Sequence, residues 1–148
     1  MQFIRNAQRI QHEKASVPVV PFLLDDYSAN NPTEFAFDYI ADGIKYWYSF
    51  EATKEKIIRE SLYHAPKGQK ALVFSREQQK FNFTEDKARR KLISETVAEN
   101  QLFFSVACTM NDAVCTKAMK WFREDIFSRE TAQIFHSSYW NIQETAIC

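Results

Sequence analysis

The sequence predicts an α+β fold, in which an antiparallel β-meander of about five strands packs with one helix before it and two helices after it. Two observations support this prediction. Aromatic and polar residues alternate on both sides of a turn-forming Asp42-Gly43 pair, which is typical of a β-hairpin. From Thr84 onward the apolar spacing changes from two residues to the three or four residues of a helix.

The hairpin is the most specific of the predicted elements. Asp-Gly favours a two-residue turn with positive φ at both central positions, and such a turn places Ala41 opposite Ile44. Because side chains alternate between the faces of a strand, three aromatic pairs are then predicted on one face: Tyr39–Tyr46, Phe37–Tyr48 and Phe35–Phe50. The other face is predicted to carry mostly polar residues, with Trp47 as the exception: Asp38, Lys45, Ser49 and Glu51.

The other elements are predicted from their spacing. Residues 2–13 have apolar residues at helical intervals, and Pro18 and Pro21 follow them. The remaining strands are expected at residues 57–64, 70–76 and 80–83. In the strand at 57–64 we expect Ile58 and Leu62 on one side and Ile57 and Tyr63 on the other. In the next strand we expect Ala71, Leu72, Val73 and Phe74 to be its buried portion.

Two helices are expected after the sheet. Thr84 is a favourable N-cap, and the acidic Glu85 and Asp86 suit the first turn of a helix that continues to about residue 99. A second helix is expected over residues 101–127. Its apolar residues form a wide stripe, which we expect to pack against the sheet: Phe103, Val106, Ala107, Met110, Val114, Ala118, Trp121 and Phe122.

Composition indicates one folded domain without a strongly charged surface. The 148 residues are 45% hydrophobic and carry no formal net charge, so nucleic acid is not an expected partner. The basic run at residues 87–91 is expected to be a solvated helix face. No apolar run approaches the ~20 residues of a membrane helix, and residues 1–14 do not have the pattern of a signal peptide. We therefore expect a cytoplasmic protein.

No residue is assigned a catalytic, nucleotide-binding or metal-binding role from the sequence. The three cysteines, Cys108, Cys115 and Cys148, have no metal-site spacing and are expected to be reduced structural thiols. The histidines His12, His64 and His136 are scattered. Asp25-Asp26 is the nearest approach to a pair of catalytic acids, and adjacent acids in a polar loop are expected to be solvated.

Five segments carry a resemblance to a known family: Pro21–Asp26 (PFLLDD), Asn31–Phe35 (NPTEF), Asp42–Glu51 (DGIKYWYSFE), Leu72–Arg76 (LVFSR) and residues 99–124. Together they are similar to the AAA-type, abortive-infection (antiphage) ATP-binding proteins, whose ATPase heads are like those of ABC, SMC and RecF proteins. The resemblance implies that residues 1–128 form part of the first lobe of such a head. It also implies that intact relatives bind ATP and Mg²⁺.

The sequence lacks the motifs that such an ATPase uses for catalysis. A phosphate-binding loop needs several glycines, whereas this chain has only Gly43 and Gly68, each in a predicted turn; nor does an apolar strand end in Asp-Glu, as Walker B requires. We therefore expect a catalytically incomplete fragment of an ATPase, with a divergent tail at residues 129–148. Its expected partner is the remaining half of the head, or a second copy. The alternative is a non-enzymatic module that binds a protein partner through its sheet and its helix stripe.

Overall fold

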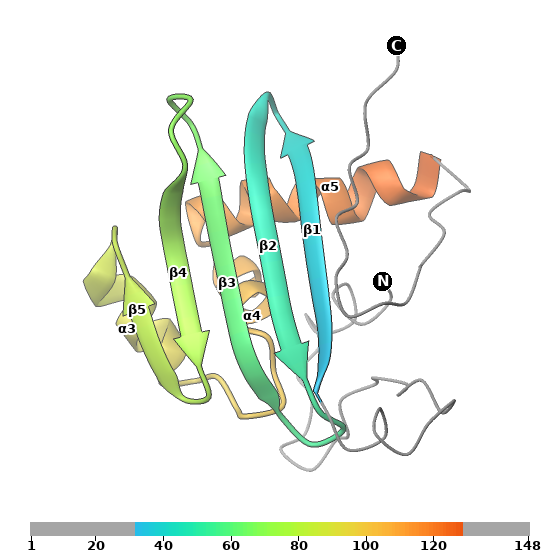
Figure 1. Cartoon of the computed structure of the whole chain (residues 1–148). Coiled ribbons are helices and arrows are strands. Elements are labelled where there is room, and N and C mark those ends of the chain that lie inside the picture. The colour runs from blue at the N-terminus through green and yellow to red at the C-terminus, as the bar shows by residue number, and fades with distance from the viewer. Residues whose placement is uncertain (1–31, 129–148) are drawn as a thin grey trace, which may run out of the picture.

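The structure, a computed structural model, describes residues 32–128. These residues form five strands and three helices. The strands are β1 (Thr33–Ala41), β2 (Ile44–Ala52), β3 (Ile57–Ala65), β4 (Ala71–Glu77) and β5 (Lys80–Phe83). They form one sheet in the order β1-β2-β3-β4-β5, and each neighbouring pair is antiparallel. The predicted α+β meander is confirmed (Figure 1). The helix expected at residues 2–13 and the tail at residues 129–148 lie outside the described residues.

The hairpin has the predicted register. Ala41 is opposite Ile44, and the three aromatic pairs face each other as expected. Asp42 has a φ of 50° and Gly43 a φ of 76°, as the two-residue turn requires. The Phe35 and Phe50 ring centroids lie 4.8 Å apart and those of Tyr39 and Tyr46 lie 5.5 Å apart. Aromatic stacking therefore joins β1 to β2 along the length of both strands.

The predicted faces of β3 were partly wrong. Ile57 and Leu62 are both fully buried, although the alternation placed them on opposite faces. The register shifts between Glu51, which pairs with Arg59, and Ala52, which pairs with Ile57, and a bulge of this kind changes which side a residue faces. In β4, Val73 and Phe74 of the expected apolar run are buried, whereas Leu72 is half-buried and Ala71 is exposed.

The helices differ from the prediction in their bounds. They are α3 (Lys87–Ser94), α4 (Phe103–Thr109) and α5 (Ala113–Ser128). Thr84 is not the N-cap of α3: its hydroxyl donates to the Leu72 carbonyl, and the cap position falls to Asp86. The single helix expected at residues 101–127 is two helices, because Asn111 takes a positive φ of 58° and interrupts it.

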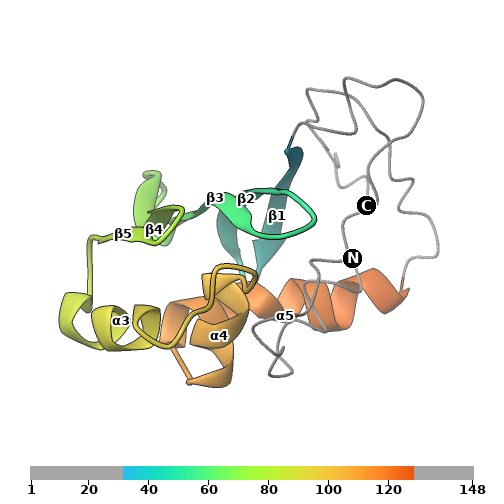
Figure 2. The same ribbon diagram turned by 90° about the horizontal axis from the view of Figure 1, so that it is seen from below.

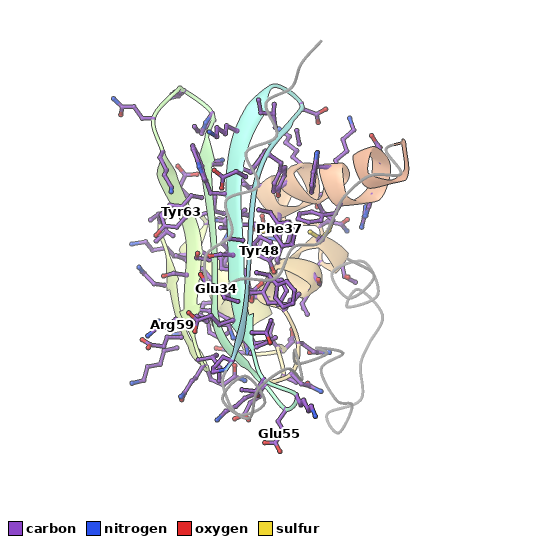
Figure 3. All side chains as sticks on the ribbon, turned by 45° about the vertical axis from the view of Figure 1, so that its right-hand side comes forward. Glu34, Phe37, Tyr48, Glu55, Arg59 and Tyr63 are labelled. Atoms are coloured by element: carbon purple, nitrogen blue, oxygen red, sulfur yellow. The ribbon has the colours of Figure 1, made fainter. Side chains whose placement is uncertain are left out.

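The helices cover one face of the sheet. Figures 1 and 2 show α3, α4 and α5 on the same side of all five strands. The predicted packing of the stripe against the sheet is confirmed for its central residues, since Phe103, Ala107, Ala118 and Phe122 are fully buried. In Figure 3, Phe37 and Tyr48 point toward the helices, whereas Arg59 and Tyr63 project from the other face. No described element covers that other face.

Candidate functional site

The face of the sheet that the described helices leave open has an ordered middle row. Cross-strand register aligns four small polar residues along one line across β2, β3, β4 and β5: Ser49, Ser61, Ser75 and Asn82. The Ser49 and Ser61 hydroxyls are 3.0 Å apart and hydrogen-bonded to each other. Because these side chains are small and lie on successive strands about 4.8 Å apart, they form a continuous low line on the surface, with larger side chains on either side of it.

A charged row borders the polar row on one side. Glu34, Glu51, Arg59, Glu77 and Lys80 follow one another across the strands. Arg59 lies between Glu51 and Glu77, with nitrogen–oxygen distances of 3.6 Å to each. Together the two rows line an open depression of about 440 Å³. Arg59 and Glu77 are largely exposed, so these ion pairs add little stability and remain accessible to a binding partner.

Aromatic and basic side chains lie on the other side of the polar row. The Lys70 ammonium lies 4.7 Å from the ring centroids of both Trp47 and Tyr63, and the Lys45 ammonium lies 5.0 Å from that of Trp47. Each such contact is a cation–π interaction, worth about 0.5–1 kcal/mol at an exposed site. Trp47, which the hairpin pattern left as an exception on a polar face, is accounted for by these two lysines.

Beneath the open face, a buried ion pair connects the sheet to the helices. Glu60 of β3 and Arg76 of β4 are fully buried and 3.6 Å apart. The Glu60 carboxylate accepts hydrogen bonds from the Tyr48 hydroxyl at 3.0 Å and from the backbone N–H groups of Phe103 and Phe104 at 2.8 and 2.9 Å. These N–H groups begin α4, whose N-cap position, Leu102, offers no side-chain acceptor. Glu60 therefore caps this helix from the sheet.

Arg76 binds backbone carbonyls around the segment that leads into α4. Its guanidinium donates to the backbone carbonyls of Gln78 and Gln101 at 2.6 and 2.5 Å, and more weakly to those of Ala98 and Glu99 at 3.3 and 3.4 Å. Burial raises the pKa of Glu60, and the Arg76 charge together with the three hydrogen bonds offsets part of that rise. Burial likewise lowers the pKa of Arg76. The pair fixes the segment between α3 and α4 against the sheet.

A second buried pair, Arg90 of α3 and Asp112, has a bidentate geometry. Arg90 donates to the two carboxylate oxygens of Asp112 at 2.9 and 3.3 Å, and Asp112 accepts from the N–H groups of Val114 and Cys115 at the start of α5. Burial acts to raise the pKa of Asp112, but these hydrogen bonds outweigh it and hold the pKa below its ordinary value. The solvated helix face expected at residues 87–91 is therefore wrong for Arg90, which is buried.

The remaining residues considered from the sequence do not come together in a catalytic arrangement. Cys108 and Cys115 are buried free thiols, and burial raises the pKa of both, so they are poor nucleophiles. His64 is buried near Tyr46, and burial lowers its pKa. Residues 32–128 contain no group of three or more potential metal ligands. Asp25-Asp26, His12, His136 and Cys148 lie outside the described residues.

Sequence reasoning missed all four buried charged residues. A recognisable pattern was present for two of them: Glu60 is two residues before the core residue Leu62, and Arg76 is two residues after the core residue Phe74. A charged residue in the apolar phase of two adjacent strands predicts a buried pair. Arg90 and Asp112 had no comparable pattern, because the break between α4 and α5 that brings Asp112 to a helix start was not predicted.

Comparisons with protein-family models, with curated proteins and with solved structures found no match to this chain. Among residues 32–128, none of the helices has the length and apolar character needed to cross a bilayer.

Proposed function

We propose that this chain is the antiparallel-sheet lobe of an ABC-like ATPase head of the abortive-infection type, and that it acts as a scaffold and binding surface without catalysing hydrolysis itself. The observation that carries this proposal is the division between the two faces of the sheet. One face is joined to the helices by the aromatic core and two buried ion pairs. The other presents a depression lined by the polar and charged rows, which no described element covers.

The chemistry of that depression favours binding over catalysis. Within its charged row, Glu51, Arg59 and Glu77 are already paired with one another. The Ser49 and Ser61 hydroxyls are hydrogen-bonded to each other and not to a base that would activate them as nucleophiles. The sequence holds no glycine-rich phosphate loop. ATP and Mg²⁺ would therefore be held by the complementary part of the head, and cytoplasmic location follows from the same proposal.

Two measurements test the proposal. Sequencing the DNA on both sides of the reading frame should reveal a G-x-x-x-x-G-K-[ST] segment upstream and Walker B downstream, in frame or frameshifted. Titration of the purified chain with Mg²⁺-ATP should give no saturable binding up to a concentration of ~1 mM, a range in which weak specific sites are detected. Tight nucleotide binding by the chain alone would contradict the assignment, as would unrelated flanking sequence.

The second candidate function is a stand-alone protein-interaction module. It is favoured by the open face and by the unpaired outer edge of β1 at the end of the described sheet. The helix stripe cannot serve this module in the folded chain, because its central residues are buried in the core. Unrelated flanking sequence together with specific capture of a protein partner by the open face would favour this second function.

A further inference from the structure

The outer edge of β1 is a nine-residue row of backbone groups at the end of the sheet. In a two-residue hairpin, the residues that flank the turn exchange hydrogen bonds, and the pattern then repeats at every second residue. Since Ala41 and Ile44 flank the turn, the N–H and C=O groups of Glu34, Ala36, Asp38 and Ile40 point away from β2. Within residues 32–128 no strand pairs with them.

The helical layer continues past this edge. Figures 1 and 2 both show α5 running beyond β1, so the layer beneath the sheet is wider than the described sheet above it. Trp121 of α5 stacks on Tyr39 of β1 with ring centroids 4.8 Å apart, and Trp121 and Phe35 are only partly buried. A strand added outside β1 would lie over α5 and bury these rings further. Its residues on that side would therefore be apolar.

The other side of such a strand would be basic. On the open face β1 carries Glu34 and Asp38, and the strand contains no lysine or arginine. Glu34 is directly opposite Glu51, in a pair that is not hydrogen-bonded and whose side chains are therefore close. Like charges directly opposite each other are destabilising, whereas opposite charges on adjacent strands attract. Lysine or arginine opposite Glu34 and Asp38 would neutralise this acidic edge.

We propose that the outer edge of β1 is a docking site for an extended segment of another protein, which adds to the sheet as a sixth strand and alternates apolar with basic residues. This mode of recognition takes its affinity from backbone hydrogen bonds and its specificity from alternate side chains. Antiparallel pairing of two β1 strands about Ala36 would set Glu34 of one copy against Asp38 of the other, so a basic segment fits this edge better than a second copy does in that register. The proposal does not depend on the ATPase assignment.

The test uses the full chain and a labelled peptide of four alternating lysine–valine repeats. Fluorescence anisotropy should show saturable binding, and amide exchange at Glu34, Ala36, Asp38 and Ile40 should slow by about tenfold or more. Two control peptides should not bind. One has glutamate in place of lysine, and the other is N-methylated on the backbone nitrogens that would pair with β1.

Variants of the chain locate the contact. Ala36→Pro removes an N–H that makes no bond to β2, a change that edge strands accept, and it should weaken peptide binding at least about tenfold while the circular dichroism spectrum is retained. Glu34→Gln combined with Asp38→Asn should weaken it roughly 2- to 30-fold. The matched control, Glu85→Gln with Glu95→Gln, removes two exposed carboxylates at the ends of α3, which lies beside β5 at the opposite edge of the sheet, and should leave affinity unchanged.

Three results would overturn the proposal. The first is failure of the full chain to bind the lysine–valine peptide, which would also be the result if another part of the chain covered the edge. The second is binding that Ala36→Pro leaves unaltered. The third is a homodimer that Ala36→Pro dissociates, which would show that a second copy occupies the edge.

Discussion

Replacing Glu60 by glutamine keeps the size of the side chain and removes its charge. The two oxygens of Glu60 accept three hydrogen bonds, and Arg76 lies 3.6 Å away. The glutamine oxygen can still accept from Tyr48 and Phe104, but its NH₂ group would then face the Phe103 N–H and the Arg76 guanidinium. Breaking one partner of a buried pair costs about 3–5 kcal/mol. This is a large fraction of the 5–15 kcal/mol that is typical of a folded domain.

Urea denaturation of the full chain, followed by circular dichroism and tryptophan fluorescence, measures this loss. Glu51→Gln is the matched control, because Glu51 is on the adjacent strand and its partner Arg59 is exposed. Its effect should stay within about 1 kcal/mol. If Glu60→Gln lowered the free energy of unfolding by no more than Glu51→Gln does, the proposed role of Glu60 in joining α4 and Arg76 to the sheet would be refuted.

The double variant Glu60→Leu/Arg76→Met separates the charge from the hydrogen bonds. Replacing a simple buried ion pair by apolar residues is often neutral or stabilising. Here, however, the replacement leaves the N–H groups of Phe103 and Phe104 without their acceptor, at about 1–3 kcal/mol each. We therefore expect the double variant to remain about 2–6 kcal/mol less stable than the natural sequence. Equal stability would contradict the capping role of Glu60.

Three further predictions concern single residues. Because the pKa of Asp112 is lowered in the folded chain, its contribution to stability is complete above the ordinary carboxyl pKa of about 3.9 and is lost as the pH falls through the lowered folded pKa. Asp112→Asn should therefore flatten the dependence of the urea midpoint on pH between about pH 2 and 5. An unchanged dependence on pH would contradict this role of Asp112. Tyr39→Phe removes a buried hydroxyl that lacks a hydrogen-bond partner among the described residues. The free energy of unfolding should therefore stay equal or rise by up to about 1 kcal/mol. A clear decrease would mean that the hydroxyl is paired. Gly43→Ala at a φ of 76° should cost about 1 kcal/mol in the same denaturation assay, and no change would mean that the turn relaxes.

The elements that sequence predicted well are those controlled by local chemistry. The register from Phe35 to Phe50 followed from one dipeptide turn and strict alternation, and both are properties of adjacent residues. The helix bounds after Thr84 failed for the opposite reason. Thr84 donates to Leu72 across the sheet, and Asp112 starts a new helix because Arg90 holds it there. Those contacts depend on the folded chain, which local patterns do not encode.

The candidate site was only partly visible for the same reason. The polar face of the hairpin and the exceptional Trp47 could be read from β2 alone, but the alignment of Ser49 with Ser61 and Ser75 depends on the pairing of three strands. That pairing includes a register shift beside Ala52 and another between Leu62 and Tyr63, which no turn motif indicated. A one-residue shift moves a side chain to the other face, so the composition of the open face followed only from the structure.

The separation of the two faces has a consequence for every binding experiment on this protein. The core, Glu60–Arg76 and Arg90–Asp112 all lie on the helix side of the sheet or between the sheet and the helices. Side chains of the open face, by contrast, are partly or fully exposed and make weak surface pairs. Substitution of these side chains by neutral ones should therefore change the free energy of unfolding by no more than about 1 kcal/mol each, so a loss of partner binding in such variants reports on the surface itself. If open-face variants instead unfolded the chain, that face would be part of a larger core that another element completes.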